Sequence, residues 1–356
     1  MDGRTETRGD RVTAAMRRAV ALSAAGGEVT HPNPNVGAVV LDASGEVVGE
    51  GRHERAGGPH AEVLALTAAG DRARGGTVVV TLEPCAHTGR TGPCTGALVA
   101  AGVVRVVFAV AEPNAAAAGG AEALRAAGVE VTGGLLAAEA EAANERWLTG
   151  IRLRRPFVVW KLASTLDGRV AAADGTSRWI SSPESRAHAH RLRAEVDTIV
   201  AGVGTVLADD PALTVRDPDG RLVGEQPLRV VVDTHGRTPA GAQVRDSSAP
   251  TWVATADELG TGRDGHVDLV ALLSALYDKG RSYALLEGGP TLAGAFLREG
   301  LVDEVVGYIA PKLLGAGPSA LATAGIVTIA EAIDLELIDV RRVGPDLRIT
   351  ALPKGR

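Results

Sequence analysis

The chain has 356 residues, which is more than one average domain, so its length predicts two domains. A net charge of −6 argues against a general nucleic-acid binder, which normally carries a basic face. No apolar run approaches the roughly 20 residues that span a bilayer, and the polar start has the pattern of neither a secretory signal nor a transit peptide. Because a chain with only two cysteines suits a reducing compartment, we expect a cytoplasmic protein without nucleic-acid or membrane partners.

The first part of the chain alternates predicted helices with predicted strands. A polar tail is expected over 1–10, and residues 36–42 and 47–51 predict a β-hairpin around a turn. The other strands expected here are TVVVTL, VVRVVFAV and VEVTG. Helices are expected over 11–25, 60–70, 93–101, 119–127 and 137–149. This alternation predicts a three-layer α/β domain over 11–150, with IRLRRP as a short basic connector that ends in a proline.

Two stretches of this domain, GGPHAEVLAL and TLEPCAHTGRTGPC, contain residues suited to a metal. His60 lies at an expected helix start, and Cys85 and Cys94 are the only cysteines of the chain. One imidazole and two thiolates suit zinc, with the fourth position left open for water. Glu62 is close enough to move protons to and from that water without being a ligand.

Other interpretations of these residues stay open at this point. Taken singly, His60 is more often a surface residue and each cysteine a small buried hydrophobe. A disulfide between the cysteines is a weaker third possibility, and His87 could replace one ligand. The joint occurrence of H-A-E, E-P-C and a second cysteine in strand–helix order favours the zinc site.

Three motifs carry a resemblance to a known family: HPNPNVGAVV, GRHERAGGPHAE and TLEPCAHTGRTGPC. Together they resemble the deaminase half of the bifunctional riboflavin-biosynthesis deaminase/reductase family, a domain that is similar to cytidine deaminases in fold. The resemblance implies that His60, Cys85 and Cys94 bind zinc and that Glu62 is the proton shuttle. It also implies that Asn33, His53 and the loop around His87 lie near a pyrimidine substrate.

The pattern restarts after the connector and predicts a second α/β domain over 151–356. Its expected strands are FVVWKLAST, VDTIVAGV, LRVVVDT, TWVAT, YALLEGG and VDEVVGYIAP. Its expected helices are PESRAHAHRLRAE, VDLVALLSALYDKG and TLAGAFLREG. Within LLEGGPTLAGAFL a strand runs through Gly288–Gly289 into a helix, where main-chain amides could bind a phosphate, although a Gly-Gly turn alone is weak support.

Further motifs extend the resemblance over about residues 11–330: KLASTLDGRVA, SRWISSPESR, GVGTVLADDPALTVR, EGGPTLAGAFL and YIAPKLLG. They resemble the reductase half of the same family, which is similar to dihydrofolate reductase in fold. The resemblance implies NADPH contacts at Ala163, Trp179, Thr205, Asp209, Thr234, Gly289, Pro290, Thr291, Leu292, Ala293, Gly294 and Ala295. It implies substrate contacts at Ser177, Arg193, Leu213, Arg216 and Glu287, with the arginines suited to a ribose-phosphate.

The resemblance therefore implies a bifunctional enzyme with Zn²⁺ and NADPH as cofactors. Its first reaction would be the hydrolytic deamination of 2,5-diamino-6-(5-phosphoribosylamino)pyrimidin-4(3H)-one. Its second would reduce the ribosyl chain to give 5-amino-6-(5-phosphoribitylamino)uracil. Members of the family are often homodimers or larger assemblies, so the same is expected here. Two rival hypotheses are a zinc deaminase for another base and a metal-stabilised protein without activity; the long reductase resemblance argues against the first and the presence of Glu62 against the second.

Overall fold

The computed structural model describes residues 7–25, 30, 33–55, 57–86, 92–114, 117–322 and 324–354. Its chain divides into two compact units, Met1–Leu153 and Arg154–Arg356. Within the described residues, no helix has the length and apolar character that crossing a membrane requires. Of the tail expected over 1–10, residues 1–6 lie outside the described part, and the first helix already begins at Arg8.

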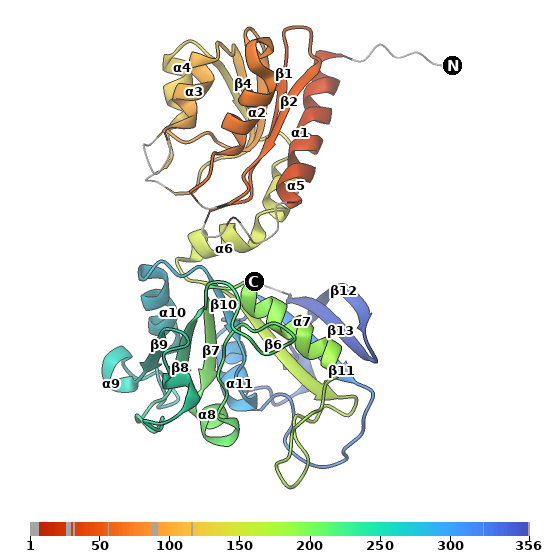
Figure 1. Cartoon of the computed structure of the whole chain (residues 1–356), viewed down its shortest axis with the longest axis vertical. Helices are drawn as coiled ribbons and strands as arrows, with labels where there is room; N and C mark the ends of the chain where they lie inside the picture. Colours follow the sequence, from red (N-terminus) through yellow and green to blue (C-terminus); the bar gives the residue numbers. More distant parts are fainter. Residues whose placement is uncertain are drawn as a thin grey trace. The chain divides into compact units, whose positions relative to one another are not determined.

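The first unit is built on a five-stranded sheet with the order β2-β1-β3-β4-β5 (Figure 1). Strand β1 pairs antiparallel with β2 and β3, whereas β3, β4 and β5 run parallel. Its elements are α1 (Arg8–Ala24), β1 (Gly37–Leu41), β2 (Val47–Arg52), α2 (Ala61–Ala69), β3 (Thr77–Leu82), α3 (Cys94–Ala100), β4 (Arg105–Val110), α4 (Gly120–Ala126), β5 (Glu130–Gly133), α5 (Ala137–Ala142) and α6 (Glu145–Leu153).

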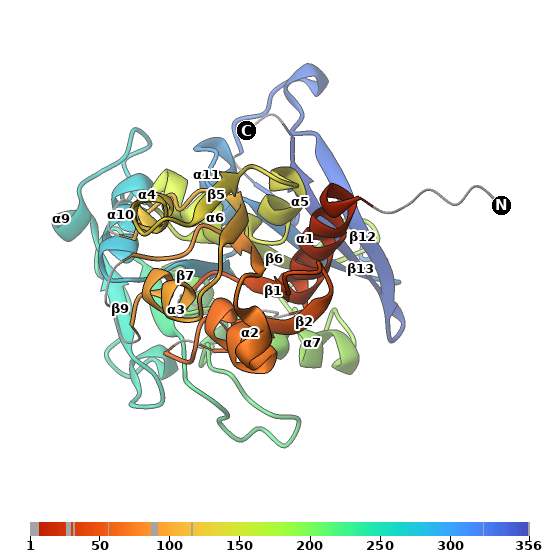
Figure 2. The same cartoon turned by 90° about the horizontal axis from the view of Figure 1, so that it is seen from above.

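Both faces of this sheet are covered by helices, which gives the three layers expected from the sequence (Figure 2). One core lies between the sheet and α2, α3 and α4, and the other between the sheet and α1, α5 and α6. All five residues of β1 and all six of β3 are buried, because a central strand covered on both faces has no polar side. This packed sheet gives rigid support to the loop after β3 and to the loop before α2.

The second unit contains an eight-stranded sheet with the order β12-β13-β11-β6-β10-β7-β8-β9. Six neighbouring strands, β11, β6, β10, β7, β8 and β9, run parallel to one another. At the β11 edge, β13 pairs antiparallel with β11, and β12 pairs antiparallel with β13. Its elements are β6 (Phe157–Thr165), α7 (Pro183–Ala194), β7 (Thr198–Gly202), α8 (Val203–Asp209), β8 (Leu228–Val232), β9 (Thr251–Ala254), α9 (Ala256–Leu259), α10 (Leu269–Asp278), β10 (Tyr283–Leu286), α11 (Pro290–Arg298), β11 (Glu304–Ala310), β12 (Leu335–Val343) and β13 (Asp346–Pro353).

Helices cover the parallel part of the second sheet on both faces. Helices α10 and α11 contribute to one core, and α7 and α8 contribute to the other. Because ligands of open α/β sheets bind beyond the carboxyl ends of parallel strands, the loops after β10, β7 and β8 are the places to search for a site.

Four local features differ from the sequence expectation. The single helix expected over 137–149 is broken at Ala143–Asn144, where the Asn144 side chain bonds to both the N–H and the C=O of Asn35. Helix α6 then continues to Leu153, so the first half of the expected connector is helical. Helix α8 and the hairpin of β12 and β13 have no counterpart among the expected elements.

Candidate active sites

His60, Cys85 and Cys94 come together at one end of the first sheet. His60 is the residue before the first turn of α2, Cys85 lies in the loop after β3, and Cys94 is the first residue of α3. The His60 Nδ1 atom lies 3.1 Å from Cys94 Sγ and 3.6 Å from Cys85 Sγ, and the potential ligand atoms all lie within 4.8 Å of one another. Both cysteines are free, so the disulfide considered from the sequence is not formed.

These separations are close to those around a tetrahedral zinc ion. Zinc bonds of about 2.0–2.1 Å to nitrogen and about 2.3 Å to sulfur place neighbouring ligand atoms roughly 3.4–3.8 Å apart. Both cysteines are buried, and the N–H of Cys94, at the N-terminus of α3, lies 3.5 Å from Cys85 Sγ. Hydrogen bonding from Cys94 and from His60 lowers the pKa of the Cys85 thiol, and the same contact raises the pKa of Cys94. A thiolate beside an imidazole is the donor set that zinc prefers.

Glu62 lies in the first turn of α2, two residues after His60, and its side chain is buried. Burial raises the pKa of Glu62, because a charged carboxylate is poorly solvated there. A carboxyl group with a raised pKa can hold a proton and release it again, which is the property that a proton shuttle needs.

Asn33 and His53 lie beside this cluster. The rings of His53 and His60 meet edge to face, with centroids 5.6 Å apart. His53 Nδ1 lies 3.0 Å from the Pro59 carbonyl oxygen, which can only accept, so Nδ1 carries the proton and Nε2 accepts from Asn33 Nδ2 at 3.0 Å. Burial lowers the pKa of His53, in agreement with a neutral ring. The expected loop around His87 lies outside the described residues.

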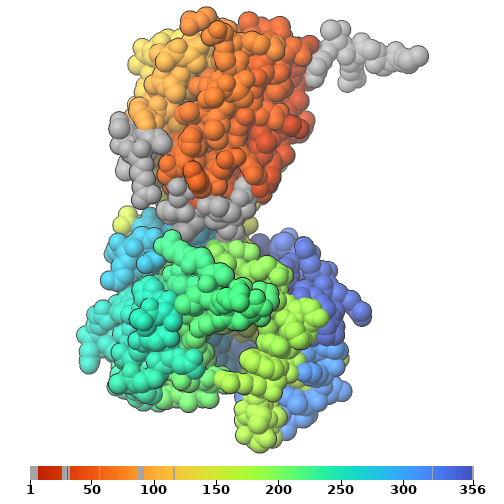
Figure 3. All heavy atoms as spheres, viewed as in Figure 1, coloured from red at the N-terminus to blue at the C-terminus, as the bar shows by residue number. Residues whose placement is uncertain are grey.

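A pocket in the second unit collects most of the residues expected to bind NADPH or substrate. Figure 3 shows the second unit hollowed between its yellow-green and green segments. The following expected residues line the pocket: Ala163, Ser177, Trp179, Arg193, Thr205, Asp209, Leu213, Arg216, Thr234, Glu287, Gly289, Pro290, Thr291, Leu292 and Ala295. Ala293 and Gly294 do not, because they lie on the buried side of α11; a Cβ atom on Gly294 would meet the Ala322 carbonyl oxygen at 1.8 Å.

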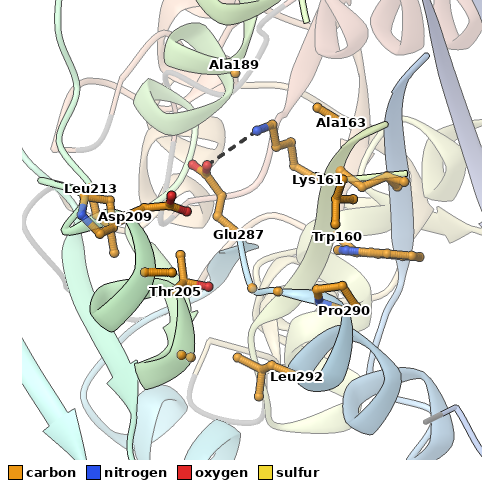
Figure 4. A pocket seen from close by; sticks show the side chains of 18 of the residues that line it. Trp160, Lys161, Ala163, Ala189, Thr205, Asp209, Leu213, Glu287, Pro290 and Leu292 are labelled. Carbon is orange, nitrogen blue, oxygen red and sulfur yellow. Dashed lines mark ion pairs between the residues drawn. The ribbon is translucent and has the colours of Figure 1, made fainter. Parts of the chain in front are cut away.

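Three charged side chains meet at the centre of this pocket. Arg193 on α7 donates to Glu287 from Nε at 2.5 Å and from Nη2 at 3.0 Å, and its Nη1 donates to the Thr214 carbonyl at 3.0 Å. Lys161 Nζ, on β6, lies 3.7 Å from the Glu287 carboxylate, and Figure 4 shows these two side chains pointing toward each other. Arg193 is therefore held in place by Glu287 and by the loop after α8, and its substrate contact, which the resemblance implies, stays a prediction.

Lys161 was missed in the sequence, although a signal was present. A lysine within the apolar strand FVVWKLAST is unusual, because buried strands rarely contain an unpaired charge. His190 was also missed: its Nδ1 accepts from the Arg216 main-chain N–H at 3.4 Å, and it lines the pocket one turn before Arg193 on α7. Burial, together with the charge of Arg193, lowers the pKa of His190.

The start of α11 adds main-chain donors to the pocket. Gly289 is the residue before this nine-residue helix, and Pro290 occupies its first turn. The first intrahelical bond is from the Ala293 N–H to the Gly289 carbonyl, so the N–H groups of Thr291 and Leu292 precede it. Amides at a helix N-terminus bind phosphate groups favourably. Figure 4 shows Pro290 and Leu292 below Glu287, facing Thr205 of α8 across the pocket.

Two family models match the chain and divide it as the folds do. Residues 10–110 match the zinc-binding region of cytidine and deoxycytidylate deaminases, and residues 156–349 match the RibD C-terminal domain. The riboflavin biosynthesis protein RibD of Mycobacterium tuberculosis H37Rv is 47% identical over 326 residues, which cover 91% of this chain and 92% of that protein. RibD of Escherichia coli K12 is 44% identical over 357 residues, which cover 93% and 96%.

Solved structures give the same relationship. Acinetobacter baumannii RibD superimposes with a TM-score of 0.82 and is 38% identical, covering 97% of this chain and 99% of that one. A diaminohydroxyphosphoribosylaminopyrimidine deaminase/5-amino-6-(5-phosphoribosylamino)uracil reductase from Thermotoga maritima has a TM-score of 0.79 and is 32% identical, covering 98% and 100%. The likeness thus extends over both units.

Proposed function

The chain belongs to the RibD family of riboflavin-biosynthesis enzymes, and on this premise we propose which residues perform its two reactions. It is a bifunctional enzyme with a zinc-dependent deaminase unit and an NADPH-dependent reductase unit. The observation that carries the assignment of residues is the convergence of His60, Cys85 and Cys94 beside the buried carboxyl group of Glu62.

In the deaminase unit, His60, Cys85 and Cys94 are the zinc ligands. A zinc ion held there would lower the pKa of water towards neutrality, which would make water a usable nucleophile. Glu62 would take a proton from the attacking water and deliver it to the amino group that leaves as ammonia. Asn33 and His53 lie beside the ligands and position the pyrimidine, with the Asn33 amide fixed by its bond to His53.

In the reductase unit, the ribosyl carbon to be reduced lies in the pocket near Glu287, Lys161 and Arg193. The hydride comes from NADPH when it is bound. Arg193 positions Glu287 and the loop at Thr214, and Ser177, Leu213 and Arg216 complete the substrate contacts. Trp179, Thr205, Asp209, Thr234 and the start of α11 form the cofactor side of the pocket.

A coupled assay on protein of known zinc content tests this function. The diaminopyrimidinone ribosyl phosphate is supplied first without NADPH and then with it. Ammonia release without NADPH, followed by NADPH oxidation after its addition, is the expected result. Ammonia release without any NADPH oxidation would contradict the reductase assignment. Absence of both signals from zinc-loaded protein would point to a different deaminase substrate.

Replacing a zinc ligand gives a sharper test of the metal site. We expect Cys85→Ser to reduce bound zinc well below about one ion per chain after dialysis, because a hydroxyl group is a poorer ligand for zinc than a thiolate. Deamination should fall with zinc content, whereas reduction of the deaminated substrate should persist, since the reductase pocket lies in the other unit. Zinc is measured by atomic emission; full occupancy in the variant would remove Cys85 from the ligand set.

We also propose that the protein is a cytoplasmic homodimer or larger homo-oligomer that uses the exposed β12 part of one face of the β12–β13 hairpin. Residues paired directly across the two strands share a face, so Leu337 with Ala351 and Val340 with Ile349 lie on the same side. The β-bulge at Ile338 keeps Leu337 and Val340 on one face although they are three residues apart. Leu337 is 63% exposed and Val340 52% exposed, an apolar surface that a second copy would cover.

The oligomeric state tests this surface. Substituting Leu337→Glu and Val340→Glu together should lower the mass measured by light scattering after gel filtration to that of a monomer. The control is Val47→Glu, which replaces an equally exposed valine at the start of β2 in the first unit. A wild-type protein that is already monomeric, or a double variant whose mass is unchanged, would contradict the proposed interface.

A further inference from the structure

The reductase pocket extends well past the charged centre at Glu287. Thr234, Arg237, Arg263 and His266 line its far end, on the loops that follow β8 and precede α10. His266 Nδ1 lies 3.3 Å from the Thr234 hydroxyl oxygen, which joins the two loops across this end. Two guanidinium groups therefore belong to a part of the pocket that the substrate contacts do not use.

Among the described residues at this end of the pocket, the acidic side chains have bonding partners and two of the arginine side chains do not. Asp264 is paired with Arg298, which also lies 3.8 Å from Glu299, and Asp268 accepts the N–H groups at the start of α10. Within the described part of the chain, the guanidinium groups of Arg237 and Arg263 have neither a hydrogen-bond nor an ion-pair partner. The carboxylates of Asp264 and Asp268 thus have bonding partners, whereas the guanidinium groups of Arg237 and Arg263 are left to face an anion.

The loop that carries Arg237 is held in place from beneath. Asp233 is fully buried, and its Oδ2 accepts from the N–H and the hydroxyl group of Thr238, both at 2.7 Å. Burial opposes ionisation of Asp233, but these bonds and nearby main-chain N–H groups outweigh it and lower its pKa. The hydrogen bonds of this buried carboxylate hold the main chain of residues 233–238 in one conformation, so the position of Arg237 is fixed.

The order of the strands relates this end to the reaction centre. The sheet runs β6-β10-β7-β8, with Lys161 on β6, Glu287 after β10, Thr205 after β7 and Thr234 after β8. Neighbouring strands are about 4.8 Å apart, so Thr234 lies roughly 10 Å along the sheet from Glu287. A dinucleotide whose nicotinamide lies at Glu287 and whose pyrophosphate lies at the start of α11 must place its adenosine at the β8 end.

We propose that Arg237 and Arg263 bind the 2′-phosphate of the adenosine of NADPH and thereby make the reductase select NADPH over NADH. The inference rests on the proposed reductase function and names the residues that set its cofactor preference. A guanidinium group matches phosphate oxygens with two parallel donors, and two of them around a dianion form strong charge-assisted bonds. NADH lacks this phosphate, so it gains nothing from either arginine.

The variant that tests the proposal is Arg237→Ala with Arg263→Ala. Both side chains are exposed, so the substitutions should leave folding intact. We expect KM for NADPH to rise about tenfold to a hundredfold, while kcat/KM with NADH and the deaminase rate stay unchanged. The control is Arg245→Ala, an exposed arginine of the same unit that does not line the pocket.

A binding measurement separates this result from a catalytic effect. Calorimetric titration with adenosine 2′,5′-bisphosphate should show affinity in the wild type and in Arg245→Ala but a loss of about tenfold or more in the double variant. Titration with adenosine 5′-monophosphate should not distinguish the three proteins. An unchanged preference for NADPH over NADH, or a rise in KM for the phosphorylated substrate alone, would overturn the proposal. A wild type that oxidises neither cofactor would instead contradict the reductase function.

Discussion

Replacing Glu62 by glutamine should reduce the deaminase rate by about a hundredfold to ten-thousandfold, because an amide has the shape of the carboxyl group but cannot move a proton. Glu62 is buried in the first turn of α2, and burial raises its pKa, so the wild-type group is suited to take up and release protons. Ammonia release from the diaminopyrimidinone ribosyl phosphate measures the effect directly.

Two further measurements show whether Glu62 acts in the reaction or only supports the metal site. The variant should keep its zinc, since His60, Cys85 and Cys94 are unchanged, and it should still oxidise NADPH with the deaminated substrate. Glu122→Gln is the matched control, because Glu122 also lies in the first turn of a helix of this unit but is exposed. Undiminished deamination, or loss of zinc together with activity, would remove Glu62 from the role of proton shuttle.

The proposed zinc ligands could be found in the sequence because cysteine is rare in this chain and all three residues lie within two short motifs. The chain has only two cysteines, and both lie within about a turn of a predicted strand end or helix start. A pair of cysteines that binds a metal needs a further ligand such as histidine. His60 lies just before the preceding helix, and Glu62 lies in the first turn of that helix. The structure brings His60, Cys85 and Cys94 together as this pattern indicated.

The centre of the reductase pocket could not be predicted in the same way. Arg193 and Glu287 are 94 residues apart, and no periodicity within a helix or strand links them. The resemblance implies that Arg193 contacts the substrate, but no pattern in the sequence indicates that its guanidinium group is also bonded to Glu287 and to the Thr214 carbonyl. Glu287 meets Lys161 because β10 lies beside β6 in the sheet. The order of the strands in this sheet differs from their order in the chain, so the sequence does not reveal this contact.

The hairpin of β12 and β13 escaped the sequence analysis for a different reason. Polar and apolar residues do not alternate regularly along β12, and neither do buried and exposed ones. The bulge at Ile338 changes the face on which the following residues lie. Leu337 and Val340 are therefore three residues apart in the chain but share a face in the sheet. A period of two, which identifies most half-buried strands, fails at such a place.

Replacing Glu287 by glutamine should destabilise the second unit by about 3 kcal/mol near neutral pH and lower the reductase rate. Burial opposes ionisation of Glu287, but the charges of Arg193 and Lys161 outweigh it and hold its pKa at about 2. A glutamine would leave the largely buried guanidinium group of Arg193 without its counter-charge, and loss of one partner from a buried pair costs about 3–5 kcal/mol. Glu299→Gln, which removes a more exposed carboxylate 3.8 Å from Arg298, is the control and should cost about 1 kcal/mol or less.

The pH dependence of this difference identifies its electrostatic origin. A carboxyl group whose pKa is lowered from 4.5 to about 2 on folding stabilises the folded state fully above pH 4.5 and progressively less as the pH falls toward 2. The wild type and Glu287→Gln should therefore differ most in urea unfolding at pH 7, and their free energies should converge as the pH falls from 4.5 toward 2. Tryptophan fluorescence reports mainly the second unit, which contains Trp160, Trp179 and Trp252. A difference that stays constant with pH would mean that Glu287 stabilises the unit by packing, and its ion pair with Arg193 would then contribute little.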